Sequence, residues 1–274
     1  MIRTGFIGLL IAVLFMLWTP LKAAPPQQTL TPQELATVGF EQRLGSTLPL
    51  NTMLRDERGA AVRLGSYFGD RPVIMAFAYY ECPNLCTVVL NALLESVRDL
   101  RSQAGREYEI VVVSINPADT PAKALAKKQM YATRYGRPGS ERGWHFLTGD
   151  AVAIKAVTEA AGFRYIYDPA SQQFAHASGI LVATPGGAVS QYFQGIEYPA
   201  KEVSAALERA SHQQVGTLAQ RLLLLCFHYD PVTGRYSLLI SRVLRIAGLG
   251  TVVALGVFIV RMSRAERRVT RKAV

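Results

Sequence analysis

Charged residues are few in this chain of 274 residues, at 18%, and cysteine occurs only three times. Hydrophobic residues make up half of the chain, which excludes a disordered or fibrous protein and indicates that some segments belong in lipid. The sequence contains neither the glycine-rich G-x-G-x-x-G fingerprint nor a P-loop. A C-x-x-C-H haem attachment motif is also absent.

Acidic residues are fewer than basic ones, which gives a formal net charge of +10. A strongly basic chain can bind nucleic acid, but most of this charge lies at the two ends. Residues 1–22 contribute +2 and residues 261–274 contribute +5, which leaves only +3 for the rest of the chain. We therefore expect no nucleic-acid partner.

The first residues are typical of a secretory signal. Arg3 precedes the apolar stretch 5–18, and the small residues Ala23 and Ala24 follow it. Residues 1–24 are therefore predicted to be a signal peptide or, if they are not cleaved, a signal anchor. The largely polar residues 25–43 are predicted to form a linker.

A second hydrophobic segment, residues 238–260, is predicted to be a transmembrane helix. Its uncharged part, 246–260, is shorter than the roughly 20 apolar residues of a typical span, so Arg242 and Arg245 would lie near the interface. The positive-inside rule assigns the arginine-rich tail 261–274 to the cytoplasm. The protein would then be tethered to the inner membrane, with its domain on the periplasmic or extracytoplasmic side. The alternative is a buried C-terminal helix followed by a basic tail.

Residues 44–211 have the pattern of one α/β domain, joined to the membrane segment by a juxtamembrane connector over 212–237. Strands and helices alternate before a hairpin and a final helix, an order typical of a thioredoxin-like mixed sheet flanked by helices. The predicted strands cover 50–53, 61–64, 73–79, 110–115, 144–147, 164–167, 180–184 and 189–193, and the predicted helices cover 85–100, 121–135, 150–161 and 199–210.

Two cysteines, Cys82 and Cys86, lie where the first long strand meets its helix. Cysteines four positions apart at a helix N-terminus lie on one face, about one turn apart. The free N–H groups and the helix dipole lower the pKa of a thiol there and favour the thiolate. Such a pair can chelate copper(I) or form a reversible disulfide. A structural disulfide, or two buried thiols, is the alternative.

The domain offers few imidazoles to join the cysteines. His145 lies within a predicted strand, so we interpret it as a packed residue, and His212 follows the last helix, where it is interpreted as solvated. His176 lies in the predicted loop before the strand 180–184, and in a thioredoxin-like sheet that loop lies beside the cysteine turn. From the pattern alone, His176 fits a loop residue and a metal ligand equally well.

The turn 79–87, His176 and the following strand–Pro-Gly-Gly–strand hairpin together resemble the Sco/SenC family. The similarity covers about residues 44–210, and the branch it resembles most also carries an extension like residues 226–234 before a membrane helix. The resemblance implies copper ligation by Cys82, Cys86 and His176. One departure is Asn116, which stands where the family commonly has aspartate and so leaves a carboxylate role there in doubt.

The resemblance further implies a metallochaperone rather than an enzyme. Its partner would be subunit II of cytochrome c oxidase, whose binuclear copper (CuA) centre it helps to assemble, and the upstream copper donor stays unassigned. Two thiolates and one imidazole suit trigonal copper(I) and can adjust to copper(II). The alternative function is a thiol–disulfide reductase, in which Cys82 and Cys86 keep the copper-ligand cysteines of the oxidase reduced.

The third cysteine, Cys226, stands two residues before His228 in an apolar run near the predicted membrane helix. It could serve as an auxiliary copper relay, but we favour an interfacial cysteine packed against lipid or the domain. The full-length Cys226→Ala variant is therefore expected to keep the copper stoichiometry of the wild type, measured by metal analysis. A lower stoichiometry would support the relay.

Overall fold

The computed structural model describes residues 30–81, 85–216, 229–230, 235–236, 248–251 and 255. Of residues 85, 86, 229, 230, 235 and 236 it describes the backbone alone. Most of the predicted membrane segment, the predicted signal, Cys82, Cys226 and His228 lie outside the described residues. Within the described part, no helix is both long and apolar enough to cross a membrane.

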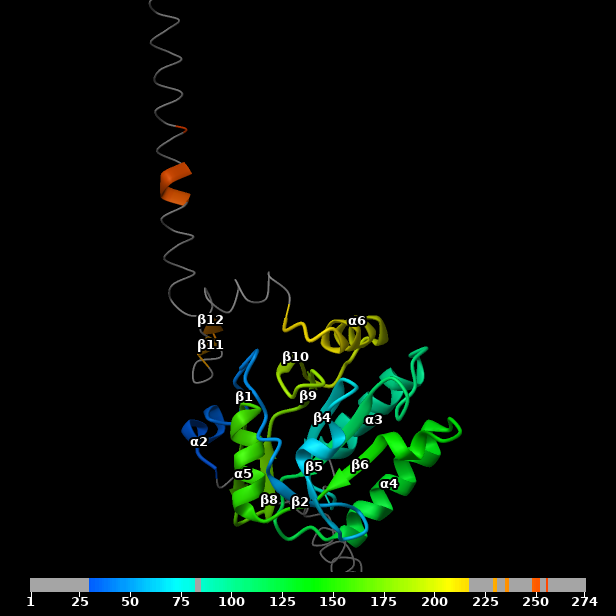
Figure 1. The fold of residues 1–274 in the computed structure, drawn as a ribbon. Coiled ribbons are helices and arrows are strands. Elements are labelled where there is room, and N and C mark those ends of the chain that lie inside the picture. Colours follow the sequence, from blue (N-terminus) through cyan, green and yellow to red (C-terminus); the bar gives the residue numbers. More distant parts are fainter. Residues whose placement is uncertain are drawn as a thin grey trace, which may run out of the picture.

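The centre of the domain is a mixed five-stranded sheet in the order β10–β9–β4–β5–β6 (Figure 1). Strands β4, β5 and β6 are parallel, and β9 runs antiparallel to both β4 and β10. All residues of β4 and β5 are buried, as the continuous apolar runs predict. The strands cover Val73–Ala78 (β4), Glu109–Ser114 (β5), Trp144–Leu147 (β6), Gly179–Ala183 (β9) and Val189–Gln194 (β10).

Helices flank this sheet, with α3 and α4 to its right in Figure 1 and α5 to its left. Helices α4 and α5 begin with a recognisable signal: Thr120 caps α4 and is followed by a proline, and Asp150 caps α5. The apolar faces of α3, α5 and α6 join one continuous core with the sheet. The helices cover Leu85–Arg98 (α3), Pro121–Tyr135 (α4), Ala151–Ala160 (α5) and Ala200–Ser211 (α6), and the short 3-10 helices cover Leu64–Tyr67 (η1) and Ser140–Gly143 (η2).

A second, three-stranded sheet has the order β1–β7–β8 and was only partly predicted. Strand β7 was expected, but His176 ends a strand rather than lying in a loop, and it pairs with Tyr165. The segment predicted as a linker contains α2 and β1, and β1 carries the buried Phe40 into the core. These elements cover Pro32–Ala36 (α2), Gly39–Phe40 (β1), Phe163–Asp168 (β7) and Gln173–His176 (β8).

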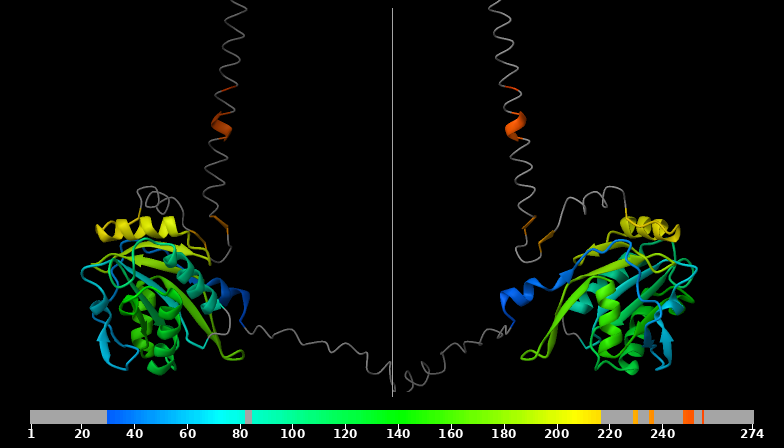
Figure 2. Two further views of the ribbon diagram at one scale, coloured as in Figure 1. Left: turned by 90° about the vertical axis from the view of Figure 1, so that its right-hand side faces the viewer. Right: turned by 60° about the vertical axis from the view of Figure 1, so that its left-hand side comes forward.

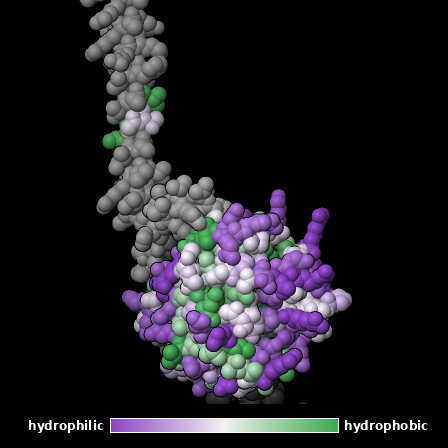
Figure 3. Space-filling model, in the orientation of Figure 1, coloured by the Kyte–Doolittle hydropathy of each residue, from purple (hydrophilic) through white to green (hydrophobic). Residues whose placement is uncertain are grey.

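Two small hairpins lie outside these two sheets. The predicted one is formed by β2 (Met53–Arg55) and β3 (Ala61–Arg63), and the other pairs β11 (Tyr229–Asp230) with β12 (Arg235–Tyr236). Figure 2 shows the domain from two further sides, with α6 along the top and the rest of the domain below it. On the face drawn in Figure 3, apolar areas are small and lie among hydrophilic side chains, which dominate the side carrying α3 and α4.

The domain therefore has the mixed α/β architecture expected from the sequence, a central sheet flanked by helices. Because β4 and β5 are parallel and in register from Val73↔Glu109 to Ala78↔Ser114, their carboxyl ends meet at one edge of the sheet. The segments that follow them, from Tyr79 and from Ile115, consequently lie side by side. The amide of Ile115 donates to the carbonyl of Ala78 at 2.9 Å.

Gly162 is a position where the backbone excludes any side chain. Its φ is +66°, and a Cβ there would lie 2.0 Å from the carbonyl oxygen of Glu41. We expect Gly162→Ala to lower the free energy of unfolding by more than about 2 kcal/mol, because left-handed strain of about 1–2 kcal/mol adds to a backbone clash. Urea unfolding followed by circular dichroism measures the change.

Gly139 provides the matched control, since its φ is +75° but nothing lies within 4 Å of an added Cβ. Gly139→Ala should cost only the left-handed strain, about 1 kcal/mol. Equal losses in the two variants would show that the contact with Glu41 does not matter.

Candidate metal centre

The cysteine turn lies at the carboxyl edge of the central sheet, between β4 and α3. Residues Tyr79 and Tyr80 leave β4 and are both buried, whereas Glu81 is exposed. Cys82 lies outside the described residues, and Cys86 is the second residue of α3 with its backbone alone described. The predicted placement at the start of a helix is therefore confirmed for Cys86, and the ligand role of the two thiols stays a prediction.

Tyr80 holds the start of this turn in the core. Its hydroxyl donates a hydrogen bond of 2.7 Å to the carbonyl of Leu147, at the end of β6. Burial raises the pKa of the Tyr80 phenol well above its usual value, so the side chain acts as a neutral anchor. Tyr80, two positions before Cys82, is thus hydrogen-bonded to the edge strand β6, which lies on the far side of β5.

His176 is a buried residue whose ring has a defined orientation. Only 7% of it is exposed, and its Nδ1 lies 2.8 Å from the carbonyl oxygen of Ala177. A neutral ring that donates from Nδ1 carries its lone pair on Nε2, which is then the nitrogen suited to a metal. Such a backbone contact is the usual way in which a ligand histidine is oriented.

Aromatic rings place His176 beside the cysteine turn. The ring of Tyr79 meets that of His176 edge-on, with centroids 6.2 Å apart, and Tyr79 precedes Cys82 by only three residues. Phe163 and Phe174 extend this apolar surrounding, at 6.1 Å from His176 and 5.4 Å from Tyr79. The structure therefore brings His176 next to the segment that leads into Cys82, although the two belong to different sheets.

A buried carboxylate, Asp119, is hydrogen-bonded to the start of the cysteine turn. It was not among the predicted site residues. Its Oδ2 accepts hydrogen bonds from the Tyr80 amide at 2.7 Å and from the Ser114 hydroxyl at 2.6 Å. Asn116, which occupies the position where an aspartate was expected, instead accepts from the Ala118 amide and shapes the local turn. The local sequence carries no signal for Asp119, because its role depends on a contact with Tyr80, 39 positions earlier in the chain.

Lys123, in the first turn of α4, extends this network to the surface. Its Nζ lies 2.7 Å from Glu81 and 3.7 Å from Asp119. The hydrogen bond to Glu81 raises the pKa of Lys123, which keeps the ammonium group charged. Glu81 is exposed, but it is also paired.

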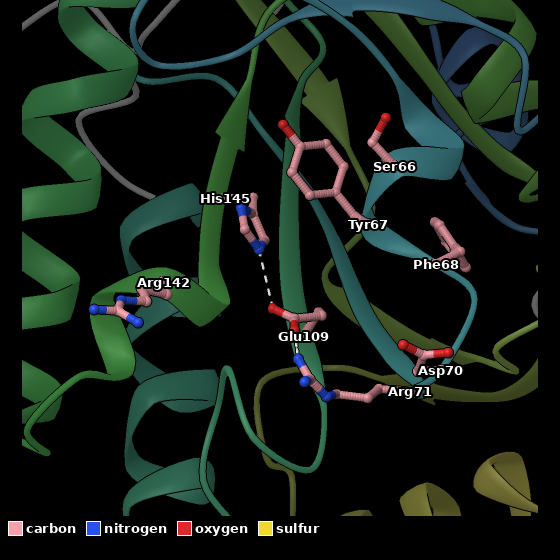
Figure 4. A pocket seen from close by; sticks show the side chains of 8 residues that line it. All are labelled: Ser66, Tyr67, Phe68, Asp70, Arg71, Glu109, Arg142 and His145. Carbon is pink, nitrogen blue, oxygen red and sulfur yellow. Dashed lines mark hydrogen bonds and ion pairs between the residues drawn. The ribbon is translucent and has the colours of Figure 1, made fainter.

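The other histidines of the domain lie away from the turn. His145 packs against Tyr67, and its Nε2 lies 3.0 Å from Glu109, which also pairs with Arg71 at 2.6 Å (Figure 4). These residues line a pocket of about 270 Å³ at the amino ends of β5 and β6, the edge opposite the cysteine turn. The interpretation of His145 as a packed strand residue is confirmed, and His212 is exposed beside Glu208.

Within the described residues, no three His, Cys, Asp or Glu side chains are grouped so that they could hold a metal ion. The described part of the candidate centre therefore consists of one imidazole, an apolar wall and the network under the turn. A metal ion here would need ligands beyond the described side chains, and Cys82 and Cys86 stay the predicted ones. The residue types still suit a soft metal, because thiolates and a neutral imidazole are ligands that copper(I) accepts.

Comparison with known proteins points to one family. The SCO1/SenC family model matches residues 52–212. A putative electron transfer protein from Aquifex aeolicus VF5 is 21% identical, with a TM-score of 0.55 over 63% of this chain and 96% of that one. BsSco, a member of the Sco family of cytochrome c oxidase assembly proteins in which a disulfide switch has been identified, is 19% identical with a TM-score of 0.50, over 64% and 99% of the two chains.

Relatives with bound copper also occur among the solved structures. Bradyrhizobium japonicum ScoI with copper bound is 22% identical, with a TM-score of 0.47 over 61% of this chain and 99% of that one. No curated protein matches this sequence. The likeness to the Aquifex protein and BsSco shows that the described domain has their fold.

The role of Asp119 in holding the turn leads to a stability prediction. Asp119→Ala removes the acceptor of a buried amide and a buried hydroxyl, so the free energy of unfolding should fall by about 2–3 kcal/mol. Urea denaturation measures the loss, and Asp99→Ala, at an exposed position, serves as the control. Equal stability of the two variants would contradict the anchoring role.

Proposed function

Because the chain belongs to the SCO1/SenC family, we propose that it is a copper chaperone that binds its cargo through Cys82, Cys86 and His176. In this proposal it delivers copper to the CuA centre in subunit II of cytochrome c oxidase. The predicted signal and the segment 238–260 would tether it to the inner membrane, with the domain on the extracytoplasmic side. The basic tail 261–274 would then lie in the cytoplasm.

The observation that carries the proposal is the setting of His176. Its Nδ1 contact with the Ala177 carbonyl orients the ring, and its contact with Tyr79 puts it beside the cysteine turn. A thiol–disulfide enzyme needs no such imidazole, whereas a third soft or borderline ligand completes a trigonal copper(I) site. The apolar rings around His176 also limit the access of water, which protects a reduced metal and its thiolates.

The chemistry of transfer follows from this donor set. Copper binding releases the thiol protons, because only the thiolates bind the metal. A three-coordinate ion leaves room for a ligand of the acceptor to enter before a ligand of the donor departs. Copper can therefore pass between the two proteins without becoming free in solution.

The alternative function is a thiol–disulfide reductase acting on the copper-ligand cysteines of the oxidase. Two observations favour it as the second candidate. Cys86 is the second residue of α3, at a helix N-terminus, where thiolates are stabilised, and the similar protein BsSco has a disulfide switch. The same two thiols would serve both functions in turn, since a reduced pair can bind copper and an oxidised pair cannot.

Copper(I) titration of the reduced full-length chain tests the proposal. We expect one copper ion to bind at this site. His176→Ala should weaken binding by at least roughly 100-fold, the upper range for losing an outer-shell partner and so a lower bound for losing a ligand. Competition with a chromophoric copper(I) chelator measures the affinity.

His212→Ala is the control for this titration, because His212 is an exposed histidine of the same domain. Binding that is equally tight in His176→Ala and the wild type would contradict the three-ligand site. A wild-type chain that binds no copper but reduces a disulfide in the oxidase subunit would establish the reductase instead.

A further inference from the structure

Glu81, the residue next to the first motif cysteine, forms an ion pair that adds little to the stability of the fold. Glu81 directly precedes Cys82, and two-thirds of its side chain is exposed, yet its carboxylate lies 2.7 Å from the Nζ of Lys123. An exposed ion pair contributes little to stability by itself. What this contact does is restrain the direction in which the chain enters the cysteine turn.

The partner, Lys123, lies where a cation is unfavourable for its own helix. It is the third residue of α4, whose first turn contains no acidic residue. The N-terminal end of a helix carries partial positive charge and favours anions. Lys123 therefore depends on carboxylates outside the helix, and the structure supplies two of them, Asp119 and Glu81.

Asp119 is the fixed end of this arrangement. Its side chain is fully buried, and its Oδ2 is bonded to the Tyr80 amide and the Ser114 hydroxyl. Its Oδ1 has no hydrogen-bond partner among the described residues, so the ammonium group of Lys123, 3.7 Å away, is the charge that compensates it. Lys123 thus connects a buried anchor to the exposed residue beside Cys82.

We propose that Lys123 is a positioning residue for the cysteine turn, which it fixes by bridging the buried Asp119 to Glu81. The proposal rests on the proposed copper site, because its purpose is to hold Cys82 where it meets Cys86 and His176. The bridge restrains the turn at Tyr80 through Asp119 and at Glu81 through Lys123. Because the turn is restrained at both of these residues, it is ordered before the metal binds, and less conformational freedom is lost on binding.

A double-mutant cycle in the full-length chain, with Cys226→Ser in every variant, tests this inference. Lys123→Gln and Glu81→Gln should each weaken copper(I) binding by roughly tenfold, the lower range for outer-shell partners of a metal site. The double variant should lose no more than Lys123→Gln alone, because that single change already breaks the contact with Glu81. Lys123→Arg keeps the charge and should retain most of the affinity.

Hydrogen exchange of the copper-free protein provides a readout that does not depend on the metal. The Tyr80 amide is bonded to Asp119, so exchange in the peptide covering residues 77–86 should be faster in Lys123→Gln and Glu81→Gln. Lys123→Arg should exchange like the wild type. Lys127→Gln is the matched control, because Lys127 lies one turn further along α4 and forms no ion pair with the described residues.

Each outcome decides between distinct possibilities. Unchanged copper affinity and unchanged exchange in Lys123→Gln would overturn the inference, as would an equal effect of Lys127→Gln. A loss in Lys123→Gln without any effect of Glu81→Gln would overturn the bridge and leave Lys123 only as the counter-charge of Asp119. If the wild type binds no copper, the proposed function fails, and the exchange data still decide whether Lys123 positions the turn.

Discussion

The hydrogen bond from the Tyr80 amide to the buried carboxylate of Asp119 is the contact on which the candidate centre depends. It joins the segments that follow β4 and β5 at the one edge of the sheet where both strands end. Through Ser114 the same carboxylate is tied to β5, and through Lys123 it reaches the surface. The cysteine turn is thus built on a polar network, whereas the sheet beneath it is held by apolar packing.

His176 reaches the same place by a separate route. It stands at the end of β8 in the smaller sheet, and aromatic contacts with Tyr79 and Phe163 connect that sheet to the end of β4. Two sheets therefore contribute to one centre, one through backbone continuity and the other through ring packing. The predicted thiol ligands would thus belong to the polar turn, and the predicted imidazole ligand lies among aromatic rings.

Sequence patterns predict the central sheet well, because continuous apolar runs such as Val73–Ala78 are long and bounded by clear turn signals. They miss β8 because the turn before it places Gln172 at φ +54°, where glycine or asparagine would be the usual signal. Asp119 escapes prediction for another reason. Its role depends on a long-range bond to Tyr80, and nothing in the local sequence distinguishes it from a surface aspartate before a helix cap.

The contact between His176 and Ala177 has a consequence for how the centre tolerates sequence change. The acceptor is a main-chain oxygen, so substitutions of the side chain at position 177 leave the orienting atom in place. The cysteine turn depends instead on a side chain, since one substitution at Asp119 removes its hydrogen bonds with the Tyr80 amide and the Ser114 hydroxyl at once. Among related chains, the residue at position 177 should therefore vary more than the residue at position 119.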